Sequence, residues 1–303
     1  MKKKIGYLVQ VLIVGLIFFF LIRNLSGNWE LARESLGKFK PVPLVLSAIF
    51  LGLGFMLLVR IWTLILRETG EKLPYAAACK VWFASNMGKY LPGKIWQILG
   101  MVYLAEKKGI PKLKSFSTAV VAQFFSVVSG LLLAAICFGF HWYPELPGWG
   151  GLIQIVSTVL ILVCLVFIFA PRTLESSLNL LLRLLRKETV EFYFDTRKII
   201  TYLFCYGLSW LLFGAGLFFF AAGITEVVPG FLWKATGAFS GAMVLGFLAV
   251  IVPGGLGVRE GVLAFLLSSS MPLPVTTLVA LLYRLWFTLV EVVLFGISFL
   301  IRD

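Results

Sequence analysis

The chain has 303 residues, of which 60% are hydrophobic and only 14% are charged, whereas about 25% of a typical soluble domain is charged. A soluble domain of this size has too little interior to bury so much apolar surface, so the composition excludes that class and indicates a polytopic membrane protein. The net charge is +13. In so apolar a chain this excess favours loops beside an anionic membrane surface, and no nucleic-acid partner is expected.

Six apolar stretches are long enough to cross a bilayer as helices, which takes about 20 residues each. The first follows three lysines and lacks a small-residue cleavage site, so it is expected to remain as an uncleaved span. Residues 172–192 have leucines at helical spacing with basic neighbours, which is typical of a helix in the cytoplasmic interface or of a plain connecting helix. The six predicted spans are 5–24, 43–66, 115–140, 150–170, 199–222 and 275–301.

Two further apolar regions, 76–105 and 233–270, are interrupted near their centres. Proline ends or kinks a helix because it lacks an N–H, and glycine adopts backbone angles that other residues avoid. Irregular backbone at membrane depth survives only where it is buried in protein or lines a wet cavity. We therefore expect two re-entrant helical hairpins, entered from opposite faces, within one all-α membrane domain over residues 1–303. The predicted helix-break residues are Pro92, Gly93, Pro253, Gly254, Gly255 and Gly257.

The positions of the basic residues indicate the orientation. With both termini in the cytoplasm and the two hairpins as above, seventeen of the 27 Lys and Arg lie on the inner side and five on the outer side, as the positive-inside rule requires. The alternative has eight full spans, reverses residues 107–232 and moves the lysine-rich stretch 107–114 outside. Five basic residues remain at membrane depth: Arg60, Lys89, Lys94, Arg259 and Arg284.

The charged and polar residues near the two breaks form the candidate binding site. A basic residue at membrane depth costs about 2.5–3.5 kcal/mol on insertion scales, so it usually has a partner or a function. A helix that starts after a break also offers free N–H groups to an anion. The structural alternatives are lysines that extend to the surface, and ion pairs between Arg259 and Glu260 or along the last span. The candidate lipid-headgroup residues are Asn86, Lys89, Lys94, Gln97, Arg259, Glu260, Arg284 and Glu291.

The sequence contains no motif of a soluble catalytic domain. It has no Walker-type loop, no HExxH and no GxSxG, and the Gly-x-Gly at 255–257 follows no soluble strand. The four cysteines form no CxxC pair. We therefore expect no enzymatic activity, no cofactor and no metal site.

Two motifs resemble the transmembrane, flippase-like domain of lysylphosphatidylglycerol synthases, and the resemblance covers nearly the whole chain. One motif is Asn86 followed by Leu91-Pro92-Gly93-Lys94, and the other is Val252 to Glu260, which is similar to the family's Pro-Gly-Gly-x-Gly-x-x-Glu break. The basic residue Arg284 in the last span also fits. The chain departs from the pattern after the first break, where many members have Gly-Glu and this chain has Ile95-Trp96-Gln97. That departure puts the acidic role there, and the substrate, in question.

The resemblance implies a lipid translocase that moves a phospholipid or glycolipid between the leaflets of the inner membrane. The aminoacyl-transferase domain of the synthases is absent from this sequence, so a standalone member without lipid synthesis is expected. Two alternatives stay open. One is a non-transporting membrane partner of a glycosyltransferase or another cell-envelope enzyme. The other is a proton-coupled carrier of a small solute, with Glu260 and Glu291 as proton sites.

Overall fold

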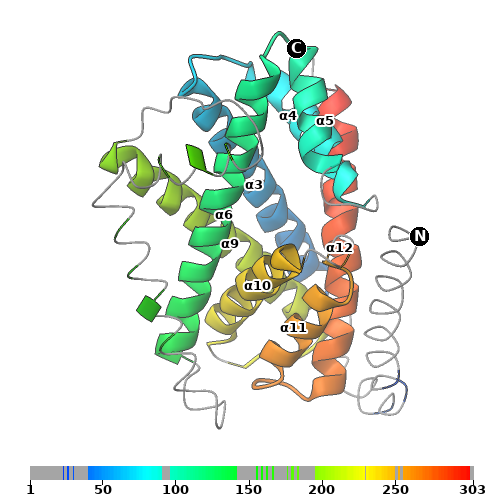
Figure 1. Cartoon of the computed structure of the whole chain (residues 1–303). Coiled ribbons are helices and arrows are strands. Elements are labelled where there is room, and N and C mark those ends of the chain that lie inside the picture. The colour runs from blue at the N-terminus through cyan, green and yellow to red at the C-terminus, as the bar shows by residue number, and fades with distance from the viewer. Residues whose placement is uncertain are drawn as a thin grey trace, which may run out of the picture.

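The computed structural model describes residues 40–90, 96–141, 195–228, 230–249, 252 and 255–300, together with a few isolated positions elsewhere. Over these ranges the protein is all-helical, with eight α-helices and one short 3-10 helix (Figure 1). The predicted span 5–24, most of the span 150–170 and most of the segment 172–192 lie outside them.

Four long helices confirm four of the predicted spans as helices. Each has 27 to 30 residues and is therefore about 40–45 Å long, which exceeds the roughly 30 Å of a bilayer's hydrocarbon core. With the 18-residue α10 (Phe231–Leu248), the described ranges hold five helices long and apolar enough to cross a membrane. The sequence treated α10 as one arm of a hairpin. The four long helices are α3 (Pro41–Arg67), α6 (Lys112–His141), α9 (Thr196–Ile224) and α12 (Leu273–Leu300).

Local signals place several helix ends. Helix α3 begins with Pro41, whose fixed φ and missing N–H suit a first helical turn. Asp195 caps α9 by accepting a 2.7 Å hydrogen bond from the backbone N–H of Lys198. Beyond the end of α3 the chain turns at Gly70, whose φ is +81°.

Helices α3 and α12 run in one direction, and α6 and α9 run in the other (Figure 1). Just beyond the end of α3, Glu71 pairs with Lys114 of α6 at 2.6 Å, and Glu68 pairs with Lys198 of α9 at 2.8 Å. At the other end, the Lys40 N–H bonds the carbonyl of Gly223 near the end of α9 at 2.9 Å. The first of these ends, here called the basic end, gathers Arg67, Lys72, Lys107, Lys108, Lys112, Lys114, Arg197 and Lys198.

The first broken region leaves the basic end and returns to it. It forms α4 (Tyr75–Asn86), the 3-10 helix η1 (Met87–Tyr90) and α5 (Trp96–Glu106). The two α-helices are only about 17–18 Å long, and they pack against each other. Because Glu71 and Lys114 form an ion pair, the segment between them starts and ends on the same side of the bundle.

The second broken region starts and ends on the opposite side. It forms α10 and α11 (Val258–Leu267), which pack against each other. Phe220, close to the end of α9, packs beside Tyr283 and Trp286 of α12, with ring centroids 5.3 and 6.0 Å apart. The end of α9 and the start of α12 therefore lie at the end opposite the basic end, and the segment between them returns there (Figure 1).

Aromatic side chains fill the centre between the long helices. Phe55 of α3 contacts Phe213 of α9 and Phe287 of α12, with centroids 5.3 and 4.9 Å apart. Gly214 lets α9 lie directly against α10, because a Cβ there would come within 2.1 Å of the Thr236 hydroxyl oxygen. This packing fixes α12 beside both broken regions.

Candidate functional site

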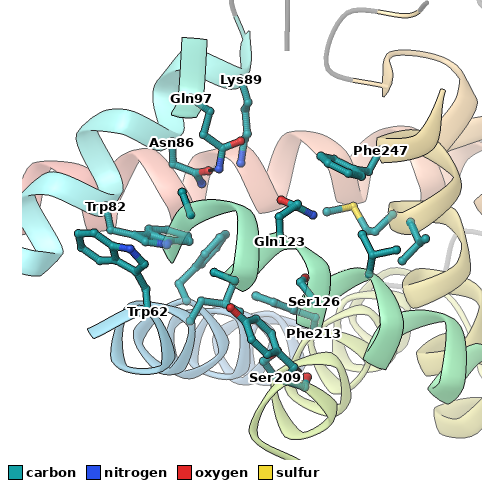
Figure 2. Close-up of a pocket in the computed structure, with 18 of the residues that line it drawn as sticks. Trp62, Trp82, Asn86, Lys89, Gln97, Gln123, Ser126, Ser209, Phe213 and Phe247 are labelled. Carbon is teal, nitrogen blue, oxygen red and sulfur yellow. Dashed lines mark hydrogen bonds between the residues drawn. The ribbon is translucent and has the colours of Figure 1, made fainter. Parts of the chain in front are cut away.

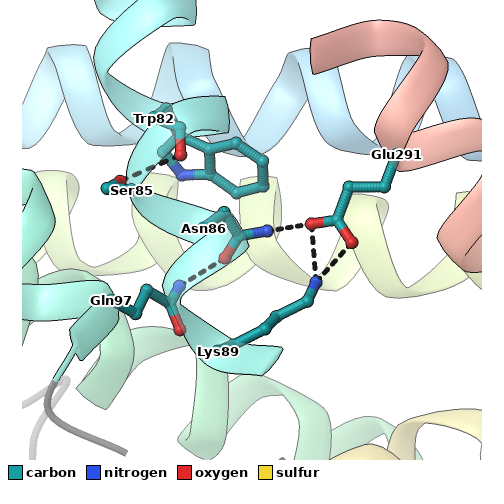
Figure 3. A network of polar contacts seen from close by, with 6 residues as sticks. All are labelled: Trp82, Ser85, Asn86, Lys89, Gln97 and Glu291. Atoms are coloured by element: carbon teal, nitrogen blue, oxygen red, sulfur yellow. Dashed lines mark hydrogen bonds and ion pairs between the residues drawn. The ribbon is translucent and has the colours of Figure 1, made fainter. Parts of the chain in front are cut away.

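The first break carries a polar network that ends on α12 (Figure 3). Lys89 Nζ of η1 donates to both carboxylate oxygens of Glu291, at 2.6 Å each. Asn86, the last residue of α4, donates to the same carboxylate, and its own carbonyl accepts a 2.5 Å bond from Gln97 of α5. Glu291 is fully buried. Lys89 therefore points into the bundle, and four predicted site residues lie in one network.

Gly88 makes this arrangement possible. A Cβ at Gly88 would lie 2.8 Å from the carbonyl carbon of Trp96, so only glycine lets η1 lie directly on the start of α5. That close approach sets Gln97 beside Asn86. The sequence prediction assigned no role to Gly88.

The second break is held by Glu260 of α11. Gly255 and Gly257 have φ values of +69° and +80°, in the left-handed region that glycine tolerates. One Glu260 oxygen accepts a 2.6 Å bond from the Gly257 N–H and so caps α11, and the other accepts from Arg284 of α12. The buried carboxylate thus ties the break to α12. Five other predicted residues lie outside the described ranges: Pro92, Gly93, Lys94, Pro253 and Gly254.

Arg259 of α11 packs against α10 at Gly246, where α10 has no side chain. A Cβ at Gly246 would come within 2.2 Å of Arg259 Cγ, and a Cβ at Gly255 would come within 2.9 Å of Arg259 Nε. The absence of side chains at these two positions gives the guanidinium its place. The sequence offered no signal for Gly246, because it is a single glycine within an apolar stretch.

The ion pairs cross between elements. The sequence suggests two structural ion pairs, Arg284 with Glu291 and Arg259 with Glu260. In the structure Arg284 binds Glu260, whereas Glu291 binds Lys89. The bases are Lys89, Arg259 and Arg284, and the acids are Glu260 and Glu291. When all five are ionised, their net charge is +1. Removing one partner from such a buried pair typically costs about 3–5 kcal/mol.

Two cavities adjoin these charges. The larger, of about 190 Å³, has Asn86, Lys89 and Gln97 in its wall (Figure 2), and Arg259 lines it as well. The smaller, of about 50 Å³, lies between α10, α11 and α12 and is lined by Glu260 and Arg284. Lys89 and Arg259 line both, so the cavities meet at these two cations. Aromatic and aliphatic side chains together form most of the rest of the larger wall, and the aromatic ones are Phe55, Trp62, Trp82, Tyr206, Trp210, Phe213, Phe247 and Phe287.

The site predicted from the sequence did not include three neutral polar residues of the larger cavity. Gln123 and Ser126 on α6 and Ser209 on α9 line it. A polar residue within a long apolar span usually faces the protein interior, so their positions carried a signal. Only the packing of the helices shows which of them meet at one cavity.

The arrangement suits a partly polar ligand with a negative charge. Two cations line a mainly apolar cavity, and cations in a low-dielectric setting bind phosphate oxygens strongly. Within the ranges that the structure describes, no three His, Cys, Asp or Glu side chains gather as a metal site would require.

Comparison with curated proteins finds no match for the chain. Comparison with protein families matches residues 7–296, nearly the whole chain, to the lysylphosphatidylglycerol synthase TM region. This protein belongs to the family of the lysylphosphatidylglycerol synthase TM region.

Proposed function

We propose that the protein is a lipid translocase that moves an anionic phospholipid or glycolipid between the leaflets of the inner membrane. The observation that carries this proposal is the larger cavity, which lies between two broken helical regions and has Lys89 and Arg259 in its wall. Membership in a flippase-like membrane family supports it.

The proposed orientation places the basic end in the cytoplasm, as the positive-inside rule favours, together with both chain termini. The first broken region is then a re-entrant hairpin from the cytoplasm, and the second is one from outside. Broken helices that meet near the midplane from opposite faces form the substrate sites of many transporters. This plan gives a headgroup a route from either face to the same cations.

The proposed chemistry is exchange of anionic partners. Arg259 and Lys89 hold the lipid phosphate, while the acyl chains stay in the bilayer. Arg259 presents a planar fork of donors that matches two phosphate oxygens. Glu291 and Glu260 keep Lys89 and Arg284 in place when no lipid is bound, and the phosphate offsets the excess positive charge. No enzymatic step is part of this proposal.

Reconstitution into liposomes tests the proposal directly. The assay follows leaflet exchange of a fluorescent phosphatidylglycerol by quenching from the outside, with wild type, Arg259→Ala and Arg259→Lys at equal incorporation. We expect loss of exchange in Arg259→Ala and partial activity in Arg259→Lys. An Arg259→Ala protein with the wild-type rate would contradict the site.

A wild-type protein that moves no anionic phospholipid or glycolipid would contradict the function itself. Co-purification with a cell-envelope enzyme would then favour a role as its membrane partner. Solute uptake that depends on a proton gradient would favour a proton-coupled carrier.

A further inference from the structure

We infer that the headgroup taken up by the larger cavity is uncharged and rich in hydroxyl groups beyond its phosphate, as a glycerol or a single sugar ring is, and carries no cationic aminoacyl group. This inference rests on the proposed lipid translocation and specifies its substrate class.

The charges around the larger cavity argue against a cationic headgroup. Among the described residues, its wall contains Lys89 and Arg259 but no Asp or Glu. The neighbouring carboxylates already have partners, since Glu291 accepts hydrogen bonds from Lys89 and Asn86 and Glu260 accepts from Arg284 and the Gly257 N–H. An ammonium group in this cavity would face two positive charges in a low-dielectric setting, where like charges repel strongly.

The neutral part of the wall offers hydrogen bonds to hydroxyl groups. Trp62 is 1% exposed, and its indole N–H has no hydrogen-bond partner within the described part of the chain. An unsatisfied buried donor costs about 1–3 kcal/mol, so a hydroxyl group that reached this N–H would be bound favourably. The amide of Gln123 and the hydroxyls of Ser126 and Tyr206 belong to the same wall. A hydroxyl both donates and accepts, so it can satisfy an indole N–H and an amide together.

The aromatic surfaces complete a site for a polyol. The rings of Trp62, Trp82 and Trp210 line the cavity between these polar groups. An aromatic face carries partial negative charge, so it attracts the polarised C–H groups of a sugar or glycerol while its area shields them from water. A mainly apolar wall, with aromatic rings and a few polar groups, is the usual composition of a small-molecule site.

The size of the cavity limits the headgroup. A volume of about 190 Å³ leaves room for a glycerol or one sugar ring beside the cations.

The test compares four lipids with the same acyl chains in liposomes that contain the full-length protein. Phosphatidylglycerol and phosphatidylinositol carry a polyol, phosphatidic acid carries the phosphate alone, and lysyl-phosphatidylglycerol carries a cation. We expect the better polyol lipid to exchange about tenfold faster than lysyl-phosphatidylglycerol, the ratio that about 1.4 kcal/mol of discrimination gives. A faster phosphatidylglycerol indicates a glycerol site, and a faster phosphatidylinositol indicates a site for a sugar-like ring.

Two variants tie this preference to the cavity. Trp62→Phe removes the indole N–H and keeps a ring, and Gln123→Leu removes the amide at similar volume. Each is expected to lower the rate for the polyol lipid relative to phosphatidic acid by about fivefold, the worth of one hydrogen bond. Trp286→Phe is the matched control, because its N–H bonds Ser47 at 3.2 Å and Trp286 is not part of the wall.

The outcomes separate the inference from the proposed function. If lysyl-phosphatidylglycerol moves as fast as the polyol lipids, or if neither variant changes the ratio more than Trp286→Phe does, the inference is wrong while translocation stands. If none of the four lipids moves with the wild-type protein, the proposed function fails.

Discussion

Each broken region forms an ion pair with α12, but the acid and the base are exchanged between the two pairs. The first region supplies a base, Lys89, and α12 supplies the acid, Glu291. The second region supplies an acid, Glu260, and α12 supplies the base, Arg284. The two residues of α12 are two helical turns apart, so one helix anchors both regions with charges of opposite sign. This comparison shows α12 to be the common support of the site.

The carboxylates of these two ion pairs, Glu291 and Glu260, are here called the first and the second anchor. They also differ in their other hydrogen-bond donors. Glu291 accepts hydrogen bonds from the side chains of Lys89 and Asn86. Glu260 in addition caps α11 through the Gly257 N–H. Replacing Arg284 therefore leaves Glu260 with a backbone donor. Replacing Glu291, in contrast, leaves the partly buried Lys89 without its carboxylate.

The largest expected effect follows from removing Glu291. The variant Glu291→Leu leaves Lys89 without its carboxylate, and breaking a buried ion pair in this way costs about 3–5 kcal/mol. Denaturation in mixed micelles measures this loss in the free energy of unfolding. The double variant Lys89→Met/Glu291→Leu is expected to recover most of it, because two apolar residues replace the pair.

A surface pair provides the control for this experiment. Glu106 and Lys112 lie 3.1 Å apart with side chains 45% and 68% exposed, so Glu106→Gln is expected to change stability by less than about 1 kcal/mol. Equal losses in Glu291→Leu and Glu106→Gln would mean that Glu291 anchors nothing.

The second anchor is expected to tolerate loss of its base better. Arg284→Met leaves Glu260 with the hydrogen bond that caps α11, so we expect a loss of about 2–3 kcal/mol, at or below the lower limit for a broken buried pair. The same denaturation assay gives the comparison with Glu291→Leu. A larger loss in Arg284→Met would reverse the ranking of the two anchors.

Two glycines are expected to separate stability from transport. In Gly88→Ala the new Cβ meets the backbone of Trp96, which cannot move freely, so overpacking of about 1–3 kcal/mol is expected. In Gly246→Ala it meets the side chain of Arg259, which can rotate away at a smaller cost. In Gly246→Ala the rate of lipid exchange is then expected to fall by a larger fraction of the wild-type value than the free energy of unfolding does.

Gly261→Ala provides the matched control for both glycine variants. It adds a Cβ in open space within α11 and is expected to stabilise the helix by about 0.5–1 kcal/mol. If Gly246→Ala lost stability and kept its exchange rate, Arg259 would have no role in transport.

The long helices could be predicted from sequence, and the partners of the charges could not. The apolar length of α3, α6, α9 and α12 is a local property, which a window of about 20 residues detects. The partners depend on tertiary packing: Lys89 and Glu291 are 202 positions apart.

Helix geometry explains why the sequence-adjacent pairs were poor choices. Residues seven apart on a helix, such as Arg284 and Glu291, are about 10.5 Å apart along its axis. Neighbours such as Arg259 and Glu260 point to different sides of a helix. Arg284, Glu291 and Glu260 therefore each form an ion pair with a residue of a neighbouring element.

The smallest expected effect is a shift of preference between lipids, through Gln97→Glu. A carboxylate at this position adds a negative charge to the cavity wall near Lys89 and removes the donor that bonds Asn86. One extra charge at the boundary of a cavity contributes on the order of 1 kcal/mol at a high effective dielectric. The exchange rate of lysyl-phosphatidylglycerol relative to phosphatidylglycerol is therefore expected to rise about fivefold, while Gln97→Met, with no added charge, is expected to leave that ratio unchanged. Equal ratios in the two variants would mean that the headgroup does not meet this part of the wall, and the first broken region would then serve only to hold Lys89 against α12.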